Sequence, residues 1–222
     1  TRQRDAGASA TREGAFSRAR SSSSERETTV PTACPSSAAW RNKDNRATSC
    51  SLYRRAPPVE RTGHTVHLGV LHGRETLYVV KEQPEHAAPV ITDVGVRLPA
   101  HLTASGRSML AALPRAQVRA LFPNRDAFVD RTGLGPRTPS ELRELLAMER
   151  TRGWSEEDGH VTAGIASVAA CVLDYGHRPA AAVSCTFPSS SVVSDDERAA
   201  LAGVVRTTAA RLAKRMAGSR TG

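Results

Sequence analysis

The chain has 222 residues and a formal charge of +9, with 31 Lys and Arg against 22 Asp and Glu. This length allows one good domain and an additional segment, and no apolar run approaches the roughly 20 residues of a membrane-spanning helix. The four cysteines form no CxxC pair and no zinc-like spacing, and the start lacks the apolar core of a signal peptide. We therefore expect a cytoplasmic protein with reduced thiols, no membrane contact, no metal and no cofactor.

Residues 1–60 differ in composition from the rest of the chain. Arg, Ser, Thr, Ala and Pro dominate, and the only Ile, Leu, Val, Met or Phe residues are Phe16, Val30, Leu52 and Val59. So little apolar surface cannot offset the conformational entropy of folding, so this segment is predicted to be a disordered basic arm. It could touch phosphate groups of a nucleic acid, or it could simply be a solvated basic run.

The first ordered elements are predicted to form a hairpin. Residues 64–71 alternate between apolar and polar, and residues 76–81 return after a turn at 72–73. Within the first strand, His64 and His67 differ by an odd number and point to opposite faces. These two histidines therefore cannot share a metal.

A helix is expected after an extended approach that ends at Pro99. Its start, Thr103–Gly106, carries only small side chains. The first N–H groups of a helix have no internal partner and lie at the positive end of its dipole. A small anion can therefore bind there, which predicts the floor of a pocket for a small organic acid. The alternative, that these residues are small only for tight packing, stays open.

Three more helices and three more strands are predicted along the rest of the chain. In order, they are a helix at 114–121, a helix at 138–152, a short strand from 154, strands at 165–173 and 180–187, and a helix at 194–216. Both later helices begin with a capping box. The helix at 138–152 offers Leu142, Leu145, Leu146 and Met148 for its buried side. Hairpins with helices grouped between them predict an α+β fold, an antiparallel sheet flanked by helices.

Five runs of the sequence resemble the effector-binding domain of the IclR family of bacterial transcriptional regulators. They are RTGHTVHLGVLHG at 61–73, DVGVRLPAHLTASGRSMLAALP at 93–114, RGW at 152–154, DGHVTAGIASVAACVLD at 158–174 and AAAVSCTFPSS at 180–190. Each run is weak by itself, but five in the right order are strong. The resemblance implies a GAF-like effector-binding domain at 61–217, followed by a tail at 218–222. It also implies a small carboxylate effector and assembly as a homodimer or tetramer.

The resemblance also implies which residues bind the effector. Contacts through backbone N–H groups fall on Ala104 and Ser105. Apolar walls fall on Val90, Leu98 and Ile165, and polar contacts fall on Glu157, Ser167, Ser184 and Thr186. Ser184 and Thr186 are two apart on a strand, so they face the same way, which independently fits a polar pocket wall. Cross-strand pairing of these two residues on a solvated face remains the alternative.

The chain departs from the family at its front. The family places a winged helix-turn-helix domain before the effector domain, and residues 1–60 contain no helix-period apolar pattern that could build one. DNA binding is therefore expected only if an intact winged-helix domain is present. We hypothesise that residues 1–60 are translated from a shifted reading frame. Translation of the other two frames upstream of the codon for Arg61 tests this hypothesis, because one of them should then encode a winged-helix domain. His160 also stands where members often carry Glu.

The expected function is a ligand-responsive transcriptional regulator of the IclR type. The alternative is a stand-alone effector-binding or dimerisation module that has lost sequence-specific DNA binding. A third function is an enzyme with Cys185 as nucleophile and His160 or His177 as base. The sequence contains no GxSxG elbow, Walker loop or HExxH motif. We therefore predict no catalytic residues and no enzymatic activity.

Overall fold

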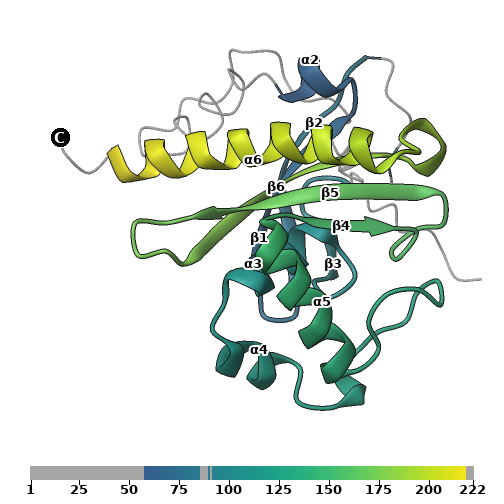
Figure 1. Ribbon diagram of the computed structural model, residues 1–222, viewed down its shortest axis with the longest axis vertical. Helices are drawn as coiled ribbons and strands as arrows, with labels where there is room; N and C mark the ends of the chain where they lie inside the picture. The colour runs from purple at the N-terminus through teal and green to yellow at the C-terminus, as the bar shows by residue number, and fades with distance from the viewer. Residues whose placement is uncertain (1–57, 86–89, 91, 219–222) are drawn as a thin grey trace, which may run out of the picture. The chain divides into compact units, whose positions relative to one another are not determined.

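The computed structural model describes residues 58–85, 90 and 92–218 (Figure 1). The predictions made for residues 1–57 lie outside these residues. The short helix α2 (Pro58–Thr62) begins three residues before the predicted boundary at Arg61.

A six-stranded antiparallel sheet with the order β3-β2-β1-β6-β5-β4 organises the described residues. The strands are β1 (Thr65–His72), β2 (Glu75–Glu82), β3 (Arg97–Pro99), β4 (Ser155–Asp158), β5 (Ile165–Leu173) and β6 (Pro179–Pro188). The predicted hairpins correspond to β1–β2 and β5–β6, and the α+β class is confirmed. The short strand β3 was foreseen only as an extended approach to the helix that follows.

The helices begin and end close to their predicted limits. They are α3 (Ala104–Ala112), α4 (Arg115–Leu121), α5 (Pro139–Arg152) and α6 (Asp195–Gly218), with single 3-10 turns at Arg125–Ala127 and Ser189–Ser191. Side-chain caps fix the starts of α3, α5 and α6, because Thr103, Thr138 and Ser194 each accept from the backbone N–H three residues later. None of the described helices has the length and apolar character needed to cross a membrane.

The helices cover the sheet on both faces. The long helix α6 lies along one face, over β5 and β6, and α3 packs against the same two strands from the other side (Figure 1). Helix α5 packs on α3 and adds a further layer below it. Helix α3 is therefore enclosed between the sheet and α5, which explains why every residue from Ala104 to Ala111 is buried rather than one apolar side alone.

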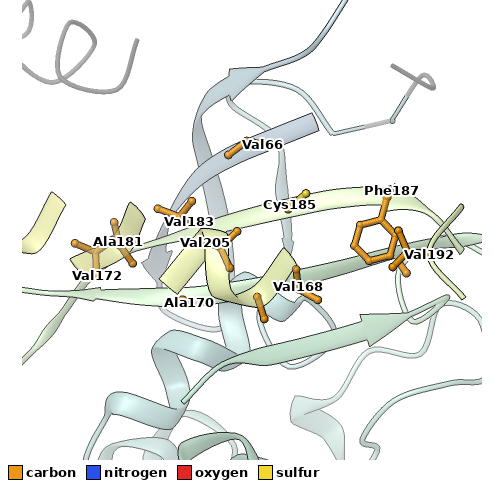
Figure 2. Packing of buried hydrophobic residues seen from close by; sticks show 13 residues of the cluster. Val66, Val168, Ala170, Val172, Ala181, Val183, Cys185, Phe187, Val192 and Val205 are labelled. Carbon is orange, nitrogen blue, oxygen red and sulfur yellow. The ribbon is translucent and has the colours of Figure 1, made fainter. Parts of the chain in front are cut away.

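Strand alternation builds the core beneath α6. Val183, Cys185 and Phe187 of β6 point toward α6, where Val205 lies over the sheet (Figure 2). The corresponding side chains of β5 are Ala166, Val168, Ala170 and Val172. Every second residue of these strands is thereby committed to the α6 core. The residues between them face α3 and are free to form a site.

Gly106 allows α3 to lie directly against the turn before it. A Cβ atom at this position would lie 2.3 Å from the carbonyl oxygen of Ala100 and 2.6 Å from Oγ1 of Thr76. The helix start is therefore small for close packing, which was the alternative left open by the sequence. Close packing at Gly106 does not by itself exclude a ligand beside the same turn.

The buried side of α5 differs from the prediction. Leu142, Leu146 and Glu149 are buried, whereas Leu145 is half-buried and Met148 is 63% exposed. The prediction for Met148 was wrong because helical spacing alone gave no reason to turn a glutamate inward. Glu149 faces α3 because it pairs there with a buried arginine.

Candidate functional site

A cavity of about 200 Å³ lies on the α3 side of the sheet. Strands β2, β5 and β6, the start of α3 and the turn after β4 all contribute to its wall. The wall is formed by Tyr78, Val90, Thr92, Val96, Leu98, Thr103, Arg131, Glu157, Val161, Thr162, Ile165, Ser167 and Thr186. Five of these residues are aliphatic and one is the aromatic Tyr78, and the other seven carry polar or charged side chains.

Six of the nine residues predicted to bind an effector line this cavity. They are Val90, Leu98, Glu157, Ile165, Ser167 and Thr186. They come from five parts of the chain, namely the connection after β2 and the strands β3, β4, β5 and β6, and the sheet brings the last three together because β5 pairs with both β4 and β6. Glu157 pairs with Ser167, which in turn pairs with Thr186, so all three lie in one row across the sheet.

The other three predicted residues lie next to the wall but do not form it. Thr103, rather than Ala104 or Ser105, supplies the helix-start part of the wall. Within the described residues, the backbone N–H groups of Ala104 and Ser105 donate to no protein acceptor. Ser184 faces the same side as Thr186, and its buried hydroxyl has no hydrogen-bond partner among the residues that the structure describes.

Glu157 is the buried acid of the site. Its carboxylate accepts a hydrogen bond from Oγ of Ser167 over 2.8 Å and one from the backbone N–H of His160 over 3.1 Å. Burial raises the pKa of Glu157 to about 7, and the hydrogen bond from Ser167, the positive charge of Arg107 and the hydrogen bond from His160 only partly oppose that rise. This carboxyl group can therefore change its charge close to neutral pH.

His67 of β1 lies behind the cavity wall and was not predicted as a site residue. Its Nε2 lies 2.9 Å from Oγ1 of Thr92, and its Nδ1 lies 3.5 Å from Oγ1 of Thr186. Burial lowers the pKa of His67 to about 4, so the ring is neutral at neutral pH. His64 instead contacts Phe187 on the α6 side, as the odd spacing predicted. The sequence signal for His67 was its place on the polar face of the first strand.

A buried arginine, Arg107 of α3, fixes the elements around the cavity. Its Nε donates to Oε1 of Glu149 over 2.9 Å, and Oε2 of Glu149 accepts from Oγ of Ser155. The two terminal nitrogens of the guanidinium group donate to the carbonyl oxygens of His101, Leu102 and Glu156 and to Nδ1 of His160. This network joins α3, α5 and β4, and sequence reasoning missed it because one arginine in an apolar helix resembles a surface residue.

The cysteine–histidine pair considered from the sequence is not formed. Cys185 points into the core beneath α6, where burial raises the pKa of its thiol to about 12 (Figure 2). His160 contacts Arg107 on the opposite face of the sheet, and His177 is exposed in the turn between β5 and β6. A thiol that remains protonated and has no base beside it is a poor nucleophile. In the part of the chain that the structure describes, no cluster of His, Cys, Asp or Glu suited to a metal ion is found.

A larger hollow of about 490 Å³ lies between α4 and α5. Arg115, Arg119 and Arg143 stand around an apolar floor that includes Phe122. None of the predicted site residues lies there, and its charged groups are exposed. We therefore assign the candidate site to the smaller cavity, where buried polar groups converge.

Comparison with known proteins identifies relatives of this chain. Residues 59–214 match the family described as "Bacterial transcriptional regulator IclR C-terminal". The chain is 31% identical over 141 residues to the transcriptional repressor IclR of Escherichia coli (strain K12), which covers 62% of this chain and 50% of the repressor. It is 32% identical over 161 residues to the glycerol operon regulatory protein of Streptomyces coelicolor, which covers 72% of this chain and 62% of that protein.

Solved structures agree with the fold. The repressor BlcR of Agobacterium tumefaciens superposes with a TM-score of 0.64 at 29% identity, over 77% of this chain and 66% of that one. The Thermotoga maritima IclR structure gives a TM-score of 0.70 at 23% identity, over 78% and 69% of the two chains, and supports the fold alone. The chain spans about half to two thirds of the length of these relatives. The named relatives are regulators, not enzymes.

Proposed function

Because this chain belongs to the IclR family of bacterial transcriptional regulators, we propose that its domain at 61–217 binds a small organic acid in the cavity beside α3. The single observation that carries the proposal is the convergence of six predicted effector residues on one cavity wall. The cavity is smaller than the roughly 300–1,000 Å³ clefts that hold drug-sized ligands. A molecule of only a few carbon atoms therefore fits its size.

The polar groups around the cavity support an anionic ligand. The unused backbone N–H groups of Ala104 and Ser105 lie directly behind Thr103, at the positive end of the α3 dipole. Arg131 adds a positive charge to the wall. The unpartnered hydroxyl of Ser184 is a further donor next to the wall, and leaving a buried polar group unpaired costs about 1–3 kcal/mol. An acid that reaches these donors would recover part of that cost.

The proposed regulatory mechanism is a shift between populations of domain arrangements. A ligand changes such an equilibrium only as far as its affinities for the two arrangements differ. Coupling between an effector site and a second site is typically about 1–3 kcal/mol, or roughly 5–150-fold in affinity. In a homodimer or tetramer that also carries a DNA-binding domain, this coupling is large enough to gate promoter occupancy. The alternative, a stand-alone sensing or dimerisation module, uses the same cavity without DNA reading.

A bulky substitution in the cavity tests the proposed site. We expect Ile165→Trp to fill the cavity and abolish binding of any small acid found in a thermal-shift screen, because the indole occupies the space the acid needs. Val193→Trp is the matched control, since Val193 is 76% exposed near the start of α6. Isothermal titration calorimetry measures the affinity of both variants. Unchanged affinity in a folded Ile165→Trp variant would show that the acid binds elsewhere.

A further inference from the structure

The cavity wall contains a carboxyl group without a positively charged partner. Glu157 is 5% exposed, and both of its hydrogen-bond donors, Ser167 and the His160 backbone, are neutral. No ion pair among the described residues includes Glu157. Glu149, by contrast, lies 2.9 Å from a guanidinium nitrogen. A negative charge on Glu157 is therefore poorly compensated by its surroundings.

The charged groups nearest to Glu157 are committed to other partners. Arg107 of α3 pairs with Glu149 of α5, and Asp158, the next residue of β4, pairs with Arg198 of α6. The charge of Arg107 still lowers the pKa of Glu157 and that of Asp158 raises it, but burial outweighs both. Arg131 reaches the cavity from the loop before α5, but it is exposed and its Nε donates to the carbonyl oxygen of Val161. Water and salt screen a charge at such an exposed position, and they screen a buried charge much less.

The ionisable groups that face Glu157 from the remaining elements are uncharged at neutral pH. Burial lowers the pKa of His67 on β1 to about 4, and burial together with Arg107 lowers the pKa of His160 to about 4. Burial raises the pKa of Tyr78 on β2 to about 12. None of these three side chains can offset a second negative charge brought in by a ligand.

We propose that the cavity takes up a small carboxylic acid together with one proton, which Glu157 holds in the bound state. This inference rests on the proposed function and adds the regulation of that site by pH. Two carboxylates confined in about 200 Å³ lie only a few ångströms apart, and two acids that share a site cannot both ionise easily. Protonation removes the repulsion and gives the Glu157 carboxyl a hydrogen to donate.

The ligand-free chain is already close to this protonation state. Because burial raises the pKa of Glu157 to about 7, adding the proton near neutral pH needs little free energy. Proton uptake on binding makes affinity fall with rising pH, because the free site must gain a proton it no longer holds. We expect a small acid to bind roughly tenfold more weakly at pH 8 than at pH 6. A neutral ligand of the same shape requires no proton, so its affinity should not change over this range.

Calorimetry on the full chain tests the inference with isovalerate and benzoate as probes, because both join an apolar body to one carboxylate. Isovaleramide and benzamide are their neutral counterparts. Titrations at pH 6, 7 and 8, each in two cationic buffers that differ in ionisation enthalpy and buffer at that pH, count the protons taken up. We expect uptake to approach one proton for each bound acid at pH 8 and none for the amides.

Variants assign the proton to a residue. Glu157→Gln imitates the protonated acid, so we expect it to bind the acids with no proton uptake and with equal affinity from pH 6 to 8. Glu156→Gln is the matched control on the same strand, because the Glu156 side chain pairs with Arg152 and does not line the cavity. This variant should keep the proton uptake of the unaltered chain. Near-ultraviolet circular dichroism checks folding, and the proton count on the unaltered chain needs no variant at all.

The outcomes separate this inference from the function it rests on. Acid binding without proton uptake, or with uptake that persists in Glu157→Gln, would overturn the inference and leave the proposed sensor intact. If neither acid binds the unaltered chain even at pH 6, and neither binds the Glu157→Gln variant at any pH, the inference and the proposed function are both overturned.

Discussion

Arg107 shows how one residue can hold a site in place without belonging to its wall. Its side chain has no exposed surface, and it joins the start of α3 to α5, to β4 and to the turn after β4. A guanidinium group suits this position because it presents five N–H donors in a rigid plane and remains charged. The residues it fixes include Glu149 and His160, and the backbone of His160 in turn donates to Glu157. The cavity acid is thus positioned through Arg107 by way of the turn.

Removal of Arg107 is expected to destabilise the domain strongly. Arg107→Met leaves Glu149 buried without its cationic partner, and breaking a buried pair in this way costs about 3–5 kcal/mol. The double variant Arg107→Met, Glu149→Leu should lose much less, because an apolar pair replaces the ions. Urea unfolding measures both, with Arg143→Met as an exposed control. A loss below about 1 kcal/mol in the single variant would contradict the importance of this pair.

At the scale of elements, α5 is oriented by its contacts with α3 and not by its own hydrophobic pattern. Leu142 and Leu146 join the core formed by α3, α4 and the following loop, which also contains Phe122. Met148, which is as apolar as these leucines, faces away. The orientation follows from Glu149, since it must reach Arg107 to avoid being buried as a lone charge.

Two truncations in α5 distinguish these positions. Leu142→Ala should lower the free energy of unfolding by about 2–5 kcal/mol, because it removes buried methyl groups and leaves a cavity. Met148→Ala should change it by less than about 0.5 kcal/mol, as is usual for exposed positions. Thermal and urea unfolding of the two variants measure the difference. Similar losses in both would mean that α5 is turned differently from the structure described.

At the scale of the whole molecule, the sheet separates an apolar face from the face that carries the proposed site. The face beneath α6 holds an uninterrupted apolar cluster, whereas the face toward α3 carries Ser167, Ser184, Thr186 and His67. The family match covers residues 59–214, and the boundary at Arg61 stays a prediction. The role of the preceding residues remains a prediction from composition.

A shortened chain tests that boundary. We expect residues 58–222 to keep the unfolding temperature and acid affinity of the full chain, because the described core lies entirely within them. Differential scanning calorimetry and ligand titration compare the two chains. A gel shift on promoter DNA adds the functional test, since sequence-specific binding by the full chain alone would contradict the alternative of a module that has lost DNA reading. A large drop in unfolding temperature would show that the arm stabilises the domain.

The sequence by itself determined the elements and which side chains share a face. Periods of two and of 3.6 residues located both hairpins and the helices, and the spacing of Ser184 and Thr186 correctly predicted that they point the same way. Capping residues set the helix starts because they act on the backbone only three residues away. These features depend on neighbours in the chain, and a pattern can therefore reveal them.

Only the tertiary structure decided which side chains meet. Arg107 and Glu149 are 42 residues apart, and His67 and Thr186 are 119 apart, so no local period relates the members of either pair. Packing also decided that Thr103, and not Ala104 or Ser105, contributes to the cavity wall. The close approach of Gly106 to Ala100 limits how α3 lies against the turn before it. The sequence limits each element to its faces, and the packing of elements against one another selects the contacts.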